Sequence, residues 1–189
     1  MHVANQAILA AAAQDAEGRG MGTTLVAAHF RGADFEIAWV GDSRAYRVGA
    51  ESITRLTHDH SWVQAMIDAG EMSSEEARSH PQRNVILQCL GRDDQALDIG
   101  LVSGRLGAHE LLLLCSDGLT GELSDAQIQH LCNSAETLDA LVSQLIALAN
   151  QAGGRDNISC IVLGRAVSEP PVAARPRGFL SKLLKPLKH

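Results

Sequence analysis

The apolar and polar residues of the chain follow helical spacing in some blocks and have strand character in others. Apolar residues recur every three or four positions from Val3 to Ala12, which predicts a first helix. Four strand-like runs follow, separated by short turns that contain Gly, Asp or Ser, at residues 23–30, 35–40, 44–48 and 52–57. Because consecutive strands joined by tight turns run antiparallel, we predict that these four form a meander.

The pattern changes at residue 61, where apolar positions resume helical spacing until Pro81. Strand-like runs return at residues 85–90, 97–102 and 110–115. Two longer helices and a last strand are then predicted at residues 124–132, 138–152 and 157–165. Strands and helices are segregated along the chain, which favours an α+β fold with antiparallel sheets over a doubly wound parallel sheet.

Two stretches place an aspartate where an apolar run meets a turn. Asp117 follows the apolar residues 111–115, and Asp156 precedes the apolar residues 158–163. If the two runs are neighbouring strands, the carboxylates come close together and repel each other unless a cation lies between them. Carboxylate oxygens suit hard ions such as Mg²⁺ and Mn²⁺. Taken alone, each Asp is more typical of an ordinary turn.

The charge of the chain is unevenly distributed. The formal net charge of the 189 residues is −6, but every lysine lies in the last eight residues. Residues 168–189 carry five basic residues against Glu169, which leaves about −10 for the remainder. This acidic body argues against a nucleic-acid substrate, since binding to a phosphate backbone needs a basic face. It is compatible with a cation site.

The length predicts one globular domain, which we expect to end near Val167. Three prolines in residues 168–178 predict a linker. Residues 179–187 form a short basic amphipathic segment, either a disordered tail or a contact to a membrane surface or a partner protein. The sequence leaves the oligomeric state open.

The expected compartment is the cytoplasm. No apolar run is long enough to cross a bilayer, and the first residues lack the basic start and unbroken apolar centre of a secretory signal. The four cysteines form no Cys-x-x-Cys pair and mostly have apolar neighbours, so we expect reduced core residues that bind no zinc: Cys89, Cys115, Cys132 and Cys160.

Six short motifs carry a resemblance to a known family. They are, in chain order, Met21-Gly-Thr-Thr24, Gly41-Asp-Ser-Arg-Ala-Tyr46, Leu56-Thr-His-Asp-His-Ser61, His80-Pro-Gln-Arg-Asn84, Ser116-Asp-Gly-Leu119 and Gly154-Arg-Asp-Asn157. Together they resemble the metal-dependent protein phosphatases of the PPM (PP2C-like) family in its bacterial form. The resemblance runs from the first helix to about Val167. It implies an α-β-β-α sandwich of two antiparallel sheets with helices outside and a metal cluster at one end.

The resemblance implies roles for particular residues. Asp117 and Asp156 match ligands of the second metal of a binuclear Mn²⁺ or Mg²⁺ pair, and Asp42 matches a ligand of a third, looser metal. Asn157 and Gly118 match neighbours that support these ligands without binding metal. Residues 61–81 correspond to a mobile flap beside the site, in which we single out three residues: Ser73, Glu76 and His80.

A zinc site is an alternative use of the motif His58-Asp59-His60, since two histidines alternate there along a strand end. The family carries a similar Thr-x-Asp-His-Ser sequence at this place without a metal. The resemblance therefore implies that neither His58 nor His60 is a metal ligand.

The implied reaction is hydrolysis of phosphoserine and phosphothreonine in proteins by a metal-activated water. The family also has a phosphate-gripping Arg, an Asn-Glu-Asp motif and an Asp-Gly-rich motif with a bridging Asp, and none of these is in the sequence. The catalytic residues thus stay unknown, and we expect the first strands of the sandwich to be missing. Three hypotheses remain: an incomplete copy of an active phosphatase, a shortened pseudophosphatase that acts as a binding module, or a remnant in which Asp117 and Asp156 are only turn residues.

Overall fold

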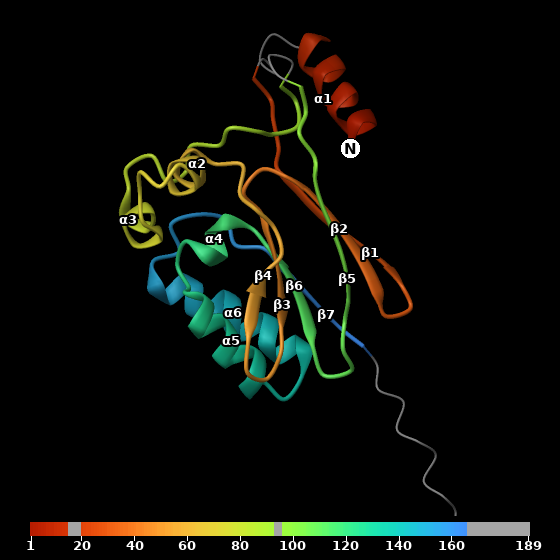
Figure 1. Cartoon of the computed structure of the whole chain (residues 1–189), viewed down its shortest axis with the longest axis vertical. Coiled ribbons are helices and arrows are strands. Elements are labelled where there is room, and N and C mark those ends of the chain that lie inside the picture. Colours follow the sequence, from red (N-terminus) through yellow and green to blue (C-terminus); the bar gives the residue numbers. More distant parts are fainter. Residues whose placement is uncertain (15–19, 93–95, 166–189) are drawn as a thin grey trace, which may run out of the picture.

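The strands of the chain form two antiparallel sheets (Figure 1). The computed structural model describes residues 1–14, 20–92 and 96–165. One sheet has the order β1-β2-β5, from Leu25–Arg31, Asp34–Val40 and Gly100–Arg105. The other has the order β4-β3-β6-β7, from Ile53–Arg55, Arg44–Val48, Leu111–Cys115 and Cys160–Gly164. The predicted α+β class is confirmed, whereas the predicted domain end, linker and tail lie outside the described residues.

Alternation in β2 makes one face of the first sheet apolar. The outward residues Asp34 and Glu36 are exposed, and the inward residues are buried: Phe35, Ile37 and Trp39. These inward residues pack against Ala45 of β3 and Leu112 and Leu114 of β6 in the second sheet. The two sheets therefore lie face to face with an apolar layer between them.

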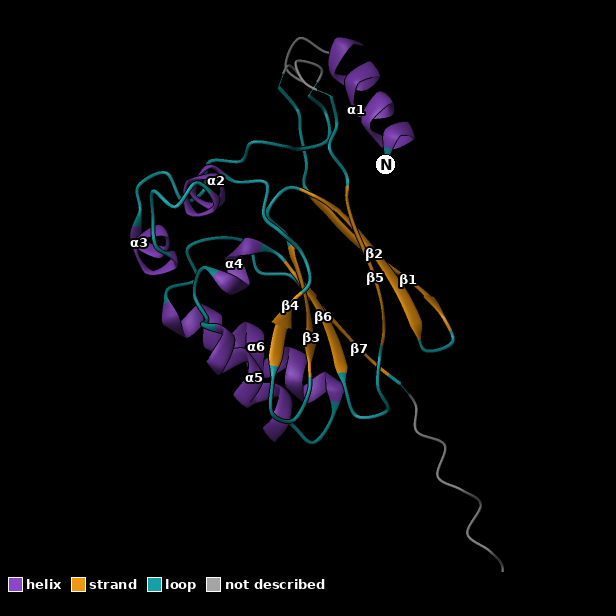
Figure 2. Cartoon of the chain, in the orientation of Figure 1, coloured by secondary structure: helices purple, strands orange, loops and turns teal. Residues whose placement is uncertain are grey.

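Strand β6 is apolar on both sides because it is covered on both sides. Leu112 packs between the sheets, whereas Leu113 belongs to a second apolar cluster with helices α5 (Asp125–Ser134) and α6 (Leu138–Ala152). These two helices run along the outer face of the second sheet (Figure 2). This double burial explains the unbroken apolar run at residues 111–115.

Helix α1 (His2–Gln14) lies beyond the end of the three-stranded sheet in Figure 1. Its buried Asn5 accepts a hydrogen bond of 2.7 Å from the N–H of Gly91 through the side-chain oxygen. No helix among residues 1–14, 20–92 and 96–165 covers the outward side of that sheet, and Leu101 of β5 is 73% exposed. No helix in the described part of the chain is long and apolar enough to cross a membrane.

The predicted four-stranded meander is wrong at its centre. β1 pairs with β2 in one sheet and β3 pairs with β4 in the other, so the chain changes sheets in residues 41–43. Gly41 has a φ of 106°, and a Cβ there would collide with the side chain of Thr24. Only glycine suits this change of direction. The turn was recognised correctly, but a turn sequence does not say with which strand the next one pairs.

Residues 85–90 do not form the predicted strand. Within the described residues, they make two isolated bridges, Ile86 with Ser61 and Leu90 with Thr23. A strand needs a continuous neighbour, and the two bridges go to different segments. Val85 is 41% exposed, so this apolar run is a connection along the surface and only its end, Leu90, is buried.

Two short helices form within residues 61–81, as predicted, and we call this segment the flap. Helix α2 (Trp62–Asp68) begins after Ser61, whose hydroxyl accepts from the N–H of Gln64. Helix α3 (Ser74–Ser79) follows a capping box, in which the side chains of Ser73 and Glu76 each accept from the other's backbone N–H. The rings of Trp62 and His80 stack with centroids 4.9 Å apart, which ties the end of α3 to the start of α2.

Candidate metal and phosphate site

Ser116 joins the two stretches that carry Asp117 and Asp156. Its N–H donates to the carbonyl of Ser159 at 3.0 Å. Its hydroxyl donates to the carbonyl of Asn157 and accepts from the N–H of Ser159, both at 3.0 Å. A single serine thus continues the pairing of β6 with β7 into the turn, which places the two aspartates at the same end of the sheet.

Gly118 allows the two turns to approach closely. Asp117 and Gly118 open the short helix α4 (Asp117–Thr120) directly after β6. A Cβ at position 118 would collide with the carbonyl of Asn157, so a larger residue would push the loop of Asp156 away. Asn157 contributes its backbone here, since its N–H donates to Asp156 Oδ1 at 2.7 Å.

Three carboxylates at this end of the sheets influence one another. Burial and the neighbouring Asp156 carboxylate raise the pKa of Asp117. Burial and the charge of Asp117 raise the pKa of Asp42 to about 6. Both shifts favour the neutral acid, so a cation placed among these groups would relieve the repulsion.

Asp42 owes its position to the step between the sheets. The preceding Gly41 donates its N–H to Nδ1 of His60 at 3.2 Å, and its carbonyl accepts from the N–H of His60 at 3.0 Å. Burial lowers the pKa of His60, which keeps the ring neutral and its Nδ1 able to accept. Hydrogen bonds to residues 57–61 therefore hold the backbone next to Asp42 in place.

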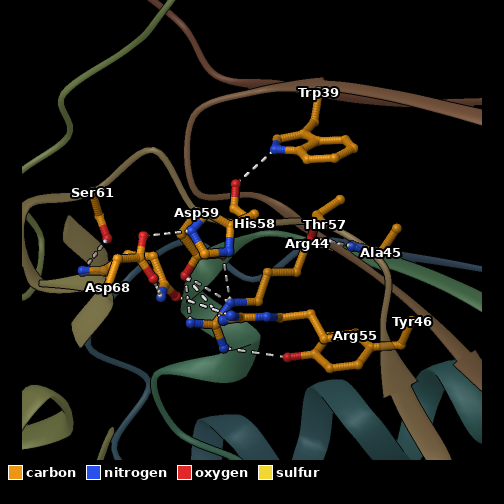
Figure 3. Close-up of polar contacts among 11 residues, drawn as sticks. Trp39, Arg44, Ala45, Tyr46, Arg55, Thr57, His58, Asp59, Ser61 and Asp68 are labelled. Carbon is orange, nitrogen blue, oxygen red and sulfur yellow. Dashed lines mark hydrogen bonds and ion pairs between the residues drawn. The ribbon is translucent and has the colours of Figure 1, made fainter. Parts of the chain in front are cut away.

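Arg44 and Asp59 form a nearly buried ion pair (Figure 3), and both charges act on Asp42. Nε of Arg44 donates to both carboxylate oxygens of Asp59 at 3.0 Å, and Nη2 donates to Oδ2 at 2.6 Å. Nη1 of Arg44 donates to the hydroxyl of Tyr46 at 3.2 Å. This bidentate pair is the strongest kind of charge-assisted contact, and it fixes β3 against residues 57–61.

Arg55 extends this network to the flap. Its Nη1 lies 3.6 Å from Asp59 Oδ2, and its Nη2 donates to Gln64 Oε1 of α2 at 2.9 Å. Gln64 Nε2 in turn donates to Asp68 Oδ1 at 2.9 Å, and Asp68 Oδ2 lies 2.7 Å from His58 Nε2. Helix α2 is thus connected by side chains to the site below it (Figure 3).

The three side chains of the zinc alternative, His58-Asp59-His60, have other partners in the structure. His58 Nε2 binds Asp68, Asp59 binds Arg44, and His60 Nδ1 accepts from Gly41. All three side chains serve the architecture around the site.

A cavity of about 610 Å³ opens between the flap and α4. Its acidic wall contains four acidic residues: Asp42, Asp117, Glu122 and Asp125. Its arginine wall combines three arginines with apolar side chains of the flap: Arg55, Arg78, Arg83, Val63, Ile67 and Ala77. The paired Arg44 and Asp59 also line it.

The flap residues singled out from the sequence do not line this cavity. Ser73 and Glu76 cap α3, and His80 stacks on Trp62, so all three shape the flap. The arginines of the arginine wall were missed. The sequence could have indicated them. Residues 1–167 contain no lysine and carry a net negative charge, so their basic residues are few, and three of these lie in or next to the flap.

The donors at the acidic wall have the right chemistry for a divalent ion but are few. Within residues 1–14, 20–92 and 96–165, no three His, Cys, Asp or Glu side chains come close enough to form a metal centre by themselves. Carboxylate oxygens are the preferred ligands of Mg²⁺ and Mn²⁺, which take six oxygens, several of them from water. Asp117 of the acidic wall and the exposed Asp156, which does not line the cavity, suit such an ion as part of a larger donor set.

Comparison with known proteins decides the family. The sequence model of Protein phosphatase 2C matches residues 2–161. The chain belongs to the protein phosphatase 2C family. This confirms the resemblance carried by the six motifs, and the two face-to-face sheets agree with the fold that it implied.

The relatives of this protein phosphatase 2C chain are bacterial phosphatases. It is 37% identical to the serine/threonine phosphatase stp of Listeria innocua over 161 residues, which are 85% of the chain and 64% of that protein. It is 40% identical to the protein phosphatase PhpP of Streptococcus pneumoniae over 147 residues, 77% of the chain and 59% of that protein. The chain thus spans less than two thirds of the length of these relatives.

Solved phosphatases share the fold of this protein phosphatase 2C chain. Stp1 of Staphylococcus aureus superposes with a TM-score of 0.80 at 38% identity, covering 84% of the chain and 62% of Stp1. The catalytic domain of the phosphatase PstP in complex with two manganese ions superposes with a TM-score of 0.75 at 33% identity, covering 84% and 65%.

Proposed function

We propose that the chain contributes the metal-binding end of a bacterial protein phosphatase that hydrolyses phosphoserine and phosphothreonine in proteins. The observation that carries the proposal is the group of Asp42, Asp117 and Asp156, in which burial and mutual repulsion raise the pKa of the first two. Membership of the protein phosphatase 2C family and relatives named serine/threonine phosphatases support the reaction class.

In this proposal each residue has a separate role. Asp117 and Asp156 hold one ion of a Mn²⁺ or Mg²⁺ pair, and Asp42 with Asp117 holds a third, looser ion. When bound, the ions supply Lewis acidity that lowers the pKa of water and stabilises charge on the phosphoryl oxygens. Gly118 keeps the two turns close enough for Asp117 and Asp156 to share a ligand.

The size and lining of the cavity determine how a phosphorylated segment of the substrate binds. Its volume of about 610 Å³ has room for a phosphorylated side chain and its neighbours. The Arg44–Asp59 pair keeps β3 and Asp42 in place below it, and Arg55 with Gln64 keeps α2 above it.

The test is hydrolysis of a phosphothreonine peptide by the chain with Mn²⁺, compared with the variant Asp117→Asn. We expect the variant to lose at least about tenfold of any Mn²⁺-dependent phosphate release that the unaltered chain shows, because it removes a charged ligand. Equal release by both proteins would contradict the assignment of Asp117. The variant Glu51→Gln, at an exposed turn, controls for the loss of one acidic side chain.

A second candidate is a pseudophosphatase that binds phosphoproteins without turnover. The small number of metal donors that the described residues bring together favours it. A non-hydrolysable phosphothreonine peptide that binds in a Mn²⁺-dependent way, with no phosphate release from the natural peptide, would support this function over hydrolysis.

A further inference from the structure

The cavity beside the acidic wall has an unusual distribution of charge. The arginine wall contributes Arg55, Arg78 and Arg83, and the segment from 55 to 84 adds one acidic lining residue, Asp59. The charge of the arginine wall therefore depends on how far Asp59 neutralises it.

Asp59 is largely used by another arginine. Arg44 donates three hydrogen bonds of 2.6 to 3.0 Å to Asp59. Arg55 Nη1 lies farther away, 3.6 Å from Asp59 Oδ2, and Arg55 Nη2 donates to the neutral Gln64. One carboxylate thus faces two guanidinium groups, and the charge of Arg55 that Asp59 leaves over also acts on Asp68 of α2, whose pKa it helps to lower.

The two other arginines differ in how free they are. Arg83 lies near Glu122, whose carboxylate already accepts from Arg155 Nε at 2.8 Å. Arg78 of α3 is exposed, and among the described residues no ion pair or side-chain hydrogen bond engages its guanidinium. The acidic residues that share its helix do not line the cavity.

We propose that the arginine wall is a subsite for an acidic side chain close in sequence to the phosphorylated residue of the substrate. This inference rests on the proposed function, because the phosphorylated residue is placed at the acidic wall. Arg78 is the main contact, since no ion pair within the described residues engages its guanidinium. Arg55 adds positive electrostatic potential from a more buried position. Val63, Ile67 and Ala77 give the aliphatic part of the bound segment an apolar surface.

The dimensions suit such a substrate. The side chains of adjacent residues in an extended segment leave the backbone on opposite sides, and residues one or two apart are separated by roughly 3.5 to 7 Å. A cavity of about 610 Å³ that is lined by both acidic residues and arginines has room for both groups of such a segment. A basic residue beside the phosphorylated residue would meet the arginine wall and be repelled.

The experiment measures binding without turnover. Three fluorescent peptides carry a non-hydrolysable phosphonate analogue of phosphothreonine followed by two Glu, two Gln or two Lys, and their anisotropy is titrated with the 189-residue chain in Mn²⁺ and about 0.1 M salt. The proteins are the unaltered chain, Arg78→Gln, Arg78→Glu and the control Arg31→Gln. Arg31 is an exposed arginine at the end of β1 that does not line the cavity.

For the unaltered chain and Arg31→Gln, we expect the Glu peptide to bind about fivefold more tightly than the Gln peptide, in line with partly exposed ion pairs. Arg78→Gln should reduce this preference to about twofold, and Arg78→Glu should make the Lys peptide the tightest. Equal binding of Glu and Gln peptides, or an unchanged preference in Arg78→Glu, would overturn the inference. Absence of phosphate release from a natural peptide contradicts only the proposed hydrolysis, because the preference is read from binding.

Discussion

Two buried aspartates that line the same cavity have opposite electrostatic surroundings. Asp59 is 8% exposed and accepts three hydrogen bonds from Arg44, with Arg55 nearby. Asp42 is 9% exposed, but its main charged neighbour is Asp117, and its pKa is raised to about 6. Both line the same cavity.

The difference separates architecture from function. A buried carboxylate that is fully paired holds elements together, and Asp59 connects β3, residues 57–61 and the flap in this way. A buried carboxylate that faces other carboxylates reduces stability, and it is retained where a ligand compensates it. We therefore regard Asp59 as structural and Asp42 as part of the site.

The largest effect is expected from Asp59→Asn. The substitution leaves the Arg44 guanidinium buried without its counter-charge, and we expect a loss of about 3–5 kcal/mol in the free energy of unfolding. Urea denaturation followed by circular dichroism measures it. Asp68→Asn is the control, because Asp68 pairs with His58 at the surface and should change stability by less than about 1 kcal/mol. Similar losses in both would mean that Asp59 is no more important than a surface pair.

The opposite sign is expected for Asp42→Asn in the absence of divalent ions. A folded-state pKa above its unfolded value means that ionising Asp42 costs more in the folded than in the unfolded chain. Removing the charge at pH 7.5 should therefore raise the free energy of unfolding by about 1–3 kcal/mol. Denaturation in EDTA measures this, with Glu51→Gln as the exposed control. A destabilised Asp42→Asn would end the contrast between the two aspartates.

Divalent metal ions should reduce the electrostatic contrast between Asp42 and Asp59. An ion that binds the folded chain alone, at about ten times its dissociation constant, stabilises it by about 1.4 kcal/mol. For a chain of this size, that is a rise of about 3–5 °C in the melting temperature. We expect the rise with MnCl₂ in the unaltered chain and at most half of it in Asp156→Asn. The same rise in both proteins would exclude Asp156 as a ligand.

The smallest effect is expected from Arg55→Met. Asp59 keeps Arg44, so the loss of the 3.6 Å ion pair and of the bond to Gln64 should cost about 1 kcal/mol or less in global stability. The consequence should be local: faster amide hydrogen exchange in α2 than in the unaltered chain. Unchanged exchange in α2 would show that Arg55 does not hold the flap.

Local chemistry explains what the sequence predicted. The turn residues after β6 and before β7 indicated where Asp117 and Asp156 lie, because apolar runs end at such residues. Helix α3 of the flap was predictable from Ser73 and Glu76, since a capping box is encoded within four residues. The double burial of β6 was visible as an unbroken apolar run.

Long-range pairing explains what the sequence did not predict. A turn at Gly41 was foreseen, but the change of sheet depends on β3 finding β6, which lies more than sixty residues later in the chain. Residues 85–90 have strand composition but find no continuous partner in the part of the chain that the structure describes. The contact of Arg55 with Gln64 and the free charge of Arg78 follow from how the flap folds back over the sheets, which no local pattern encodes.

The three-residue step from β2 to β3 also bears on the order of folding. Asp42 lies between a strand of one sheet and a strand of the other, and Asp117 follows a strand that pairs only with the second sheet. The register pairs Arg44 of β3 with Cys115 of β6, so the two carboxylates come together when these strands pair, a contact between residues distant in sequence. Assembly of the acidic group therefore depends on one strand pairing that joins residues more than sixty positions apart, and local turn formation at Gly41 or Ser116 alone does not produce it.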